Sequence, residues 1–151
     1  MKNTMRKIIL GALLCCLLIC SLASCTFSIT SHRTTSVEGI WANATYQENT
    51  TFGTGEKTIY VTVQVEEHSV IFTIKTDKST LGEAMMEHNL LEGESDMYGL
   101  YVKSVNGMIA DYDTDQSWWG LYSHGEMLMT GVDTTEIADG DVFEMVRNVG
   151  Y

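Results

Sequence analysis

Three large aromatic side chains stand close together in the sequence, at Trp118, Trp119 and Tyr122. They follow an acidic segment and fall in a run that reads as a β-strand. Because successive residues on a strand face opposite sides of a sheet, only one of the two Trp side chains can belong to the core. The other is exposed or lines a groove, where large aromatics commonly bind flat ligands or partner proteins. The pattern predicts a binding surface here, with an ordinary surface tryptophan as the alternative.

The acidic segment itself resembles the opening of a calcium loop, with Asp111, Asp113 and Asp115 at alternating positions. An EF-hand loop would continue with Gly at position 116 and Glu at position 122, and the chain has Gln116 and Tyr122 instead. We therefore expect a solvated acidic loop and no metal site.

The histidines and the missing catalytic motifs argue against an enzyme. The four histidines are scattered, without the pair at i, i+3 or i+4 that would hold a metal (His32, His68, His88, His124). His124 follows Tyr122 in an expected turn and is kept as a candidate ligand contact. The sequence has no Gly-x-Ser-x-Gly elbow, phosphate loop or dinucleotide fingerprint. We expect neither a hydrolase nor a kinase.

The first 25 residues resemble the leader of a bacterial lipoprotein. A basic start is followed by an apolar run of 13 residues, 8–20, too short for the ~20 residues that span a bilayer. The following Leu-Ala-Ser-Cys resembles the lipobox and implies that Cys25 is lipidated and becomes the mature N-terminus. An ordinary secretory leader is the alternative. We expect a signal peptide over residues 1–24 and a protein anchored on the extracytoplasmic face of the cell membrane.

Cysteine usage and charge agree with export. All four cysteines lie within the first 25 residues, so the exported part has neither a disulfide nor a cysteine nucleophile. The net charge is −11, and three of the nine basic residues lie in the leader, so the mature chain is more acidic still. Such a surface repels phosphate backbones, which excludes nucleic acid as a partner.

Residues 25–55 read as a linker and residues 56–151 as the folded domain. Seven of the eleven residues in 26–36 are Ser or Thr, which is typical of a flexible stalk. Residues 37–55 carry apolar groups without a clean period. They either dock on the domain or add an edge strand to it.

The domain begins with a predicted hairpin and a helix. Alternating apolar residues predict strands at 57–65 and 70–75. Thr80 and Glu83 form a capping box, the expected start of a helix. Apolar positions then recur at helical spacing, and Gly93 is the expected stop (Leu81, Ala84, Met85, His88, Leu91).

Further strands are predicted at 99–105, 108–110, 118–122 and 142–147. Asn106-Gly107 lies between two of these strands and favours a type I′ turn. The last strand has apolar residues on both faces, which predicts a central position parallel to 57–65. The fold class is therefore α+β, a β-grasp-like mixed sheet with one crossing helix.

The glycine and aromatic spacing resembles the DUF4430 family, which is similar to the C-terminal domain of transcobalamin and intrinsic factor. The resemblance rests on the strand before Asn106-Gly107, on Trp118-Trp119-Gly120, on Gly131 and on Gly140-Asp141. It covers about residues 57 to 147. The large helical domain that holds the other face of cobalamin in the eukaryotic relatives is not part of this chain.

The resemblance implies a small-ligand-binding domain for cobalamin or another corrinoid, with no covalently bound cofactor. The implied surface is the aromatic strand flanked by polar groups (Trp118, Trp119, Tyr122, Ser104, Asn106, His124). An uptake system or another surface protein is the implied partner. The alternative is a protein-interaction or adhesion module without a small-molecule ligand, which would show a flat patch where a binding protein shows a concave pocket.

Overall fold

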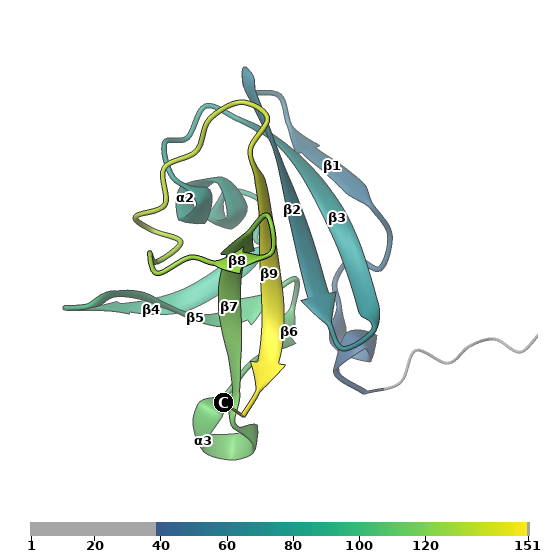
Figure 1. The fold of residues 1–151 in the computed structure, drawn as a ribbon. Helices are drawn as coiled ribbons and strands as arrows, with labels where there is room; N and C mark the ends of the chain where they lie inside the picture. The colour runs from purple at the N-terminus through teal and green to yellow at the C-terminus, as the bar shows by residue number, and fades with distance from the viewer. Residues whose placement is uncertain (1–38, 151) are drawn as a thin grey trace, which may run out of the picture. The chain divides into compact units, whose positions relative to one another are not determined.

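The computed structural model describes residues 39–150 (Figure 1). The chain divides into two units, Met1–Ser36 and Val37–Tyr151. The expected signal peptide, the lipidation site Cys25 and the Ser/Thr-rich segment lie outside the described residues. None of the described helices is long and apolar enough to cross a membrane.

The second unit has a mixed α+β fold made mostly of strands. Its larger sheet has six strands in the order β1-β3-β2-β9-β7-β8. The strands are β1 (Thr50–Gly53), β2 (Lys57–Val65), β3 (His68–Thr76), β7 (Ser117–Ser123), β8 (Glu126–Met127) and β9 (Val142–Val149).

The last strand lies inside this sheet, as its sequence predicts. β9 pairs in parallel with β2, from Tyr60 opposite Val142 to Val65 opposite Arg147, and it pairs antiparallel with β7 on its other side. One face of β9 is buried in the core, whereas Val142 on the other face is 38% exposed. The central position was therefore predicted correctly although the outer face remains open to solvent.

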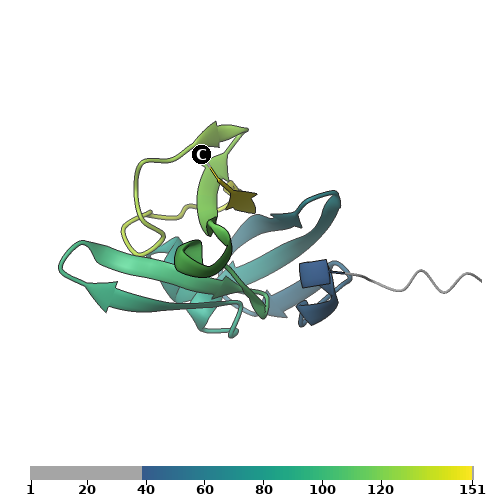
Figure 2. The same ribbon diagram turned by 90° about the horizontal axis from the view of Figure 1, so that it is seen from below.

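A second, smaller sheet has three strands in the order β4-β5-β6, namely β4 (Leu91–Asp96), β5 (Gly99–Val105) and β6 (Met108–Ile109). The Asn106-Gly107 turn between β5 and β6 has φ angles of 53° and 78°, the two positive values that a type I′ turn requires. This sheet and a short helix lie against the inner face of the larger sheet (Figures 1 and 2).

That helix, α2 (Leu81–Met86), begins as predicted and ends early. The Thr80 hydroxyl accepts from the Glu83 N–H, and the Glu83 side chain accepts from the Thr80 N–H. The predicted extension through His88 and Leu91 to Gly93 is wrong, because Asn89 has a left-handed φ of 55°. The N–H of Leu90 then bonds to the carbonyl of Met85, and Leu91 begins β4.

Residues 39–55 belong to the folded unit, although residues up to 55 were expected to form a linker. A 3-10 helix, η1 (Gly39–Asn43), places Trp41 at 5% exposure in the core. β1 pairs in parallel with β3 at the edge of the large sheet, so the edge-strand alternative is the one that the structure adopts. The expected acidic loop contains one helical turn, α3 (Tyr112–Asp115).

The core lies between the two sheets and α2. β2 contributes one of its two faces to this core: Ile59, Val61 and Val63 are fully buried, whereas Tyr60, on the other face, is 41% exposed. The same alternation in β3 buries Phe72 and leaves Ile71 at 42% exposure. Burying one face of each strand is what a period of two in hydrophobicity accomplishes.

Candidate functional site

The two adjacent tryptophans lie on opposite faces of β7. Trp119 is 9% exposed and belongs to the hydrophobic core, whereas Trp118 is half-buried on the outer face. The indole N–H of Trp118 donates to the carbonyl of Gly150 at 3.0 Å. The hydrogen-bonding capacity of the Trp118 indole is therefore satisfied within the domain.

The outer face of β7 is covered by its own side chains. A Cβ added to Gly120 would stand 2.8 Å from the Tyr122 ring, 3.0 Å from the Trp118 ring and 2.7 Å from the amide of Asn148. Because these side chains close over the glycine, the outer aromatic pair forms a packed surface at this point. The absence of a side chain at Gly120 is what allows that packing.

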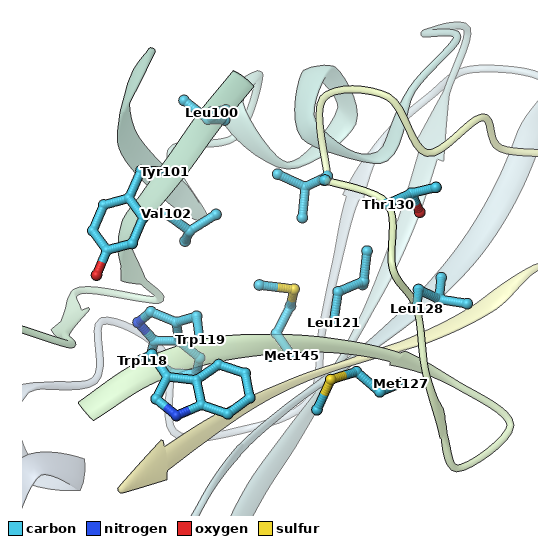
Figure 3. Close-up of a pocket in the computed structure, with 13 residues that line it drawn as sticks. Leu100, Tyr101, Val102, Trp118, Trp119, Leu121, Met127, Leu128, Thr130 and Met145 are labelled. Atoms are coloured by element: carbon cyan, nitrogen blue, oxygen red, sulfur yellow. The ribbon is translucent and has the colours of Figure 1, made fainter. Parts of the chain in front are cut away.

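A cavity of about 230 Å³ lies on the other side of β7, where Trp119 faces inward (Figure 3). It is bounded by β7, by the first half of β5 and by the segment that leaves β8. Apolar side chains dominate its lining. The lining residues are Leu100, Tyr101, Val102, Trp118, Trp119, Gly120, Leu121, Met127, Leu128, Thr130, Gly131, Val132 and Met145.

The ring of Trp119 lines this cavity, and its indole N–H is buried with no hydrogen-bond partner among residues 39–150. A buried donor without an acceptor costs about 1–3 kcal/mol relative to a satisfied one. A ligand that carries a carbonyl or carboxylate oxygen would remove that cost once the ring turns to bring the shielded N–H to the cavity. An apolar cavity with a polar group near its wall is a common form of small-molecule site.

An aspartate holds the wall of the cavity in place. The Oδ2 atom of Asp133 accepts a hydrogen bond from the N–H of Leu100 at 3.2 Å. Gly99 has a φ of 118°, and a Cβ there would meet the same carboxylate at 3.1 Å. The segment after β8 is thereby fastened to the start of β5.

The other residues predicted to bind a ligand do not line the cavity. Asn106 is fully buried, where its side-chain amide donates to the carbonyl of Tyr46 and its Oδ1 accepts from the Tyr46 N–H. Ser104 is 7% exposed in β5. His124 is exposed in the turn between β7 and β8, where its Nδ1 lies 3.0 Å from the Ser123 hydroxyl.

The acidic segment uses its carboxylates internally. The pKa of Asp111 is lowered, chiefly by the hydrogen bond from the Thr114 hydroxyl. The pKa of Asp115 is also lowered, first by the Ser117 hydroxyl and further by hydrogen bonding and charge from Arg147. Within residues 39–150, no group of three or more His, Cys, Asp or Glu side chains converges as metal ligands would.

The sequence predicts only a small part of the cavity wall. Of the six predicted residues, only Trp118 and Trp119 line it. The missed residues include Leu100 and Val102 on β5, and Leu128 to Val132 in the segment after β8. Leu100 and Val102 fall in the predicted strand 99–105, for which the sequence predicts no part in binding. The segment after β8 has no hydrophobic period that would predict its contact with β5.

Two solved structures are similar to the domain. The chain is 40% identical to a proposed metal-binding protein from Ruminococcus gnavus ATCC 29149, with a TM-score of 0.60, over 64% of this chain and 100% of the other. Haptocorrin in complex with Cbi matches with a TM-score of 0.54 at 17% identity, over 66% of this chain and 27% of haptocorrin. The second likeness shows a shared fold only.

Comparison of sequences gives the family. None of the curated proteins compared with the chain matches it. The model of the family described as Domain of unknown function (DUF4430) matches residues 78–145, which include β5, β7 and the segment after β8 that surround the cavity. With this match and the full coverage of the Ruminococcus protein, the chain belongs to the DUF4430 family.

Proposed function

We propose that the chain is a lipid-anchored extracytoplasmic protein whose DUF4430 domain captures a flat small molecule, a corrinoid, at the cavity beside Trp119. The observation that carries this proposal is an apolar cavity lined by Trp119, whose buried indole N–H has no partner among residues 39–150. The likeness of the fold to haptocorrin, which binds the corrinoid Cbi, suggests the class of ligand.

The fold is a β-grasp in this proposal. A β2–β3 hairpin leads into α2, and β9 returns parallel to β2 in the middle of the sheet. That order of hairpin, helix and central parallel strand is the arrangement that the resemblance to the transcobalamin C-terminal domain implies.

The cavity accepts only a part of a corrinoid. Its volume of about 230 Å³ lies below the roughly 300–1,000 Å³ of ordinary small-molecule pockets. One substituent with an acceptor oxygen would enter and bond to Trp119, while the ring rests on the rim. Tyr101 and Met127 stand at that rim with 45% and 46% of their surfaces exposed. A second protein, such as a component of an uptake system, would cover the other face of the ring.

The leader sequence is the feature that supports the proposed membrane anchor. A lipid on Cys25 would hold the chain at the membrane, because each buried CH2 contributes about 0.8 kcal/mol. The strongly acidic domain would not bind anionic headgroups itself. An anchored domain at the extracytoplasmic face could present its ligand to an uptake system.

Calorimetric titration of the full chain with cobalamin and with cobinamide tests the binding proposal. Trp119→Phe keeps an aromatic ring and deletes the free N–H, so it should weaken binding about fivefold, the value of one hydrogen bond. Trp118→Phe is the matched control, since its N–H already donates to Gly150. Absence of binding by both corrinoids, or equal binding by the two variants, would refute the proposed site.

An interaction module remains the second candidate, supported by exposed apolar residues at the tip of the β4–β5 hairpin. Met97 and Tyr98 are 86% and 91% exposed. Substituting both with Ser would leave corrinoid binding unchanged and abolish adhesion of cells to a protein partner if this module operates.

A further inference from the structure

One edge of β7 is unpaired along most of its length. β9 pairs with one edge from Ser117 to Tyr122, but β8 pairs with the other edge only at Tyr122 and Ser123. The N–H of Leu128 still donates to the carbonyl of Leu121 at 2.8 Å, and the chain then leaves the strand. The edge from Ser117 to Leu121 thus has no neighbouring strand among the described residues.

The direction of the free groups follows from two hydrogen bonds. The N–H of Gly150 donates to the carbonyl of Gln116 on the β9 side, and the N–H of Leu128 donates to Leu121 on the opposite side. Main-chain groups of successive strand residues alternate between the two edges. The N–H and carbonyl of Trp119 and the N–H of Leu121 therefore face away from β9.

The residues that carry these main-chain groups, Trp119 and Leu121, line the cavity. No hydrogen bond reaches the main chain of Trp119 on this side within residues 39–150. Two main-chain donors and one acceptor thus lie at the free edge, beside an apolar wall that includes Leu100 and Val102.

We propose that an extended peptide segment of a partner protein binds in this groove by adding a strand to the free edge of β7. Its main-chain carbonyl and N–H would pair with the N–H and carbonyl of Trp119. One apolar side chain of the peptide would enter the cavity. A residue that offers both an N–H and a carbonyl on one edge is complementary to another peptide main chain, which is how strand addition recognises its ligands.

The charges around the groove define the peptide further. Glu126 lies on β8 next to Met127, and Asp133 holds the wall at Leu100. The chain as a whole carries a net charge of −11. A segment with one apolar residue flanked by Lys or Arg complements these acidic groups.

This inference goes beyond the proposed capture of a corrinoid, although both occupants would use the same cavity. An open strand edge is a risk for aggregation, and proteins commonly cover such edges. Here the segment after β8 and the first half of β5 border the cavity beside the edge. An added strand would cover the edge.

Selection from a displayed library of random hexapeptides tests the inference on the full chain. Leu100→Trp, which fills the cavity, is used for counter-selection, and Ile71→Trp, at an exposed position on β3, is the matched control. We expect enriched peptides with an apolar residue between basic ones. They should bind Ile71→Trp as they bind the wild type and should bind Leu100→Trp about tenfold more weakly or worse.

Two measurements on a synthesised enriched peptide keep the test independent of how Leu100→Trp folds. Methylating the main-chain nitrogen of its apolar residue should reduce affinity about tenfold. The unmodified peptide should slow amide exchange at Trp119 and Leu121, whose N–H groups face away from β9. No enrichment over Leu100→Trp, or equal binding of the methylated peptide, would overturn the inference. Cobinamide is titrated separately: its failure with peptide binding intact refutes only the corrinoid proposal, and the converse refutes only strand addition.

Discussion

Trp118 and Trp119 are neighbours in sequence whose indole N–H groups have opposite fates. The N–H of Trp118 donates to the carbonyl of Gly150, whereas the N–H of Trp119 is buried and finds no acceptor in the part of the chain that the structure describes. The strand alternation of β7 produces this difference, since it turns one ring to the outer face and the other to the core. A ligand that supplies an acceptor for this N–H would stabilise the folded domain, which makes the cavity a candidate binding site.

Trp119→Ala should destabilise the domain much more than Trp118→Ala. Removing a buried aromatic side chain from a core costs roughly 3–5 kcal/mol. Trp118 is half-buried, so its removal should cost about 1–2 kcal/mol, including its hydrogen bond. Urea unfolding followed by circular dichroism gives both values. A larger loss for Trp118→Ala would contradict the assignment of the two faces.

Asn106→Ala should lower stability by about 2–4 kcal/mol and leave ligand affinity unchanged. The substitution removes two hydrogen bonds to Tyr46 and places alanine at a φ of 53°. Thermal unfolding measures the first effect and calorimetry the second. Weakened affinity in the protein that remains folded would show that Asn106 acts in binding.

Arg147→Met should separate β9 from the acidic segment. The Arg147 side chain is 8% exposed. Its guanidinium donates to the carbonyl of Ile109 at 3.0 Å and to the Ser117 hydroxyl at 2.9 Å, besides its ion pair with Asp115. Loss of these bonds should cost about 1–3 kcal/mol in urea unfolding. A wild-type unfolding midpoint in Arg147→Met would show that the contacts contribute nothing.

Stability should fall on acidification because Asp111 and Asp115 have lowered pKa values in the folded chain. Carboxylates of this kind contribute stability that is complete above the unfolded pKa, near 3.8, and is lost as the pH falls through the folded pKa. The loss below about pH 4 should be smaller in Asp115→Asn. Identical pH profiles for wild type and variant would contradict the role of Asp115.

Cys25→Ser should release the protein from the membrane or block its processing. Cys25 follows Leu-Ala-Ser, and no other cysteine follows it in the sequence to accept a lipid. Fractionation of cells and labelling with a radioactive fatty acid measure the change. A variant that still fractionates with membranes and still incorporates the label would refute the anchor.

Local signals in the sequence predicted the features that depend on a few adjacent residues. Asn106-Gly107 requires only its own two φ angles, and the capping box of Thr80 and Glu83 lies within one turn. The apolar pattern of 142–147 similarly placed β9 in the interior of the sheet. The first two features are determined by neighbouring residues, whereas the apolar pattern of β9 predicts its burial but not its partners β2 and β7.

Two elements were predicted wrongly for local reasons: α2 ends at Met86, ahead of the left-handed Asn89, and β4 contains Glu92, Glu94 and Asp96, which do not resemble a buried strand. The wall of the cavity depends instead on a distant contact. The cavity requires Asp133 to hold the start of β5, 33 residues away along the chain. No period in the sequence reports that contact, so the wall of the site could not be predicted.

The indole N–H signals of the tryptophans test the central claim most directly. The chain has three Trp residues, so a nitrogen–proton spectrum contains three such signals, which single Trp→Phe variants assign. On addition of cobinamide, or of the enriched peptide, the Trp119 signal should move downfield as its N–H gains an acceptor, while the Trp118 signal stays in place. If either occupant binds and the Trp119 signal does not move, the cavity beside β7 is not the binding site.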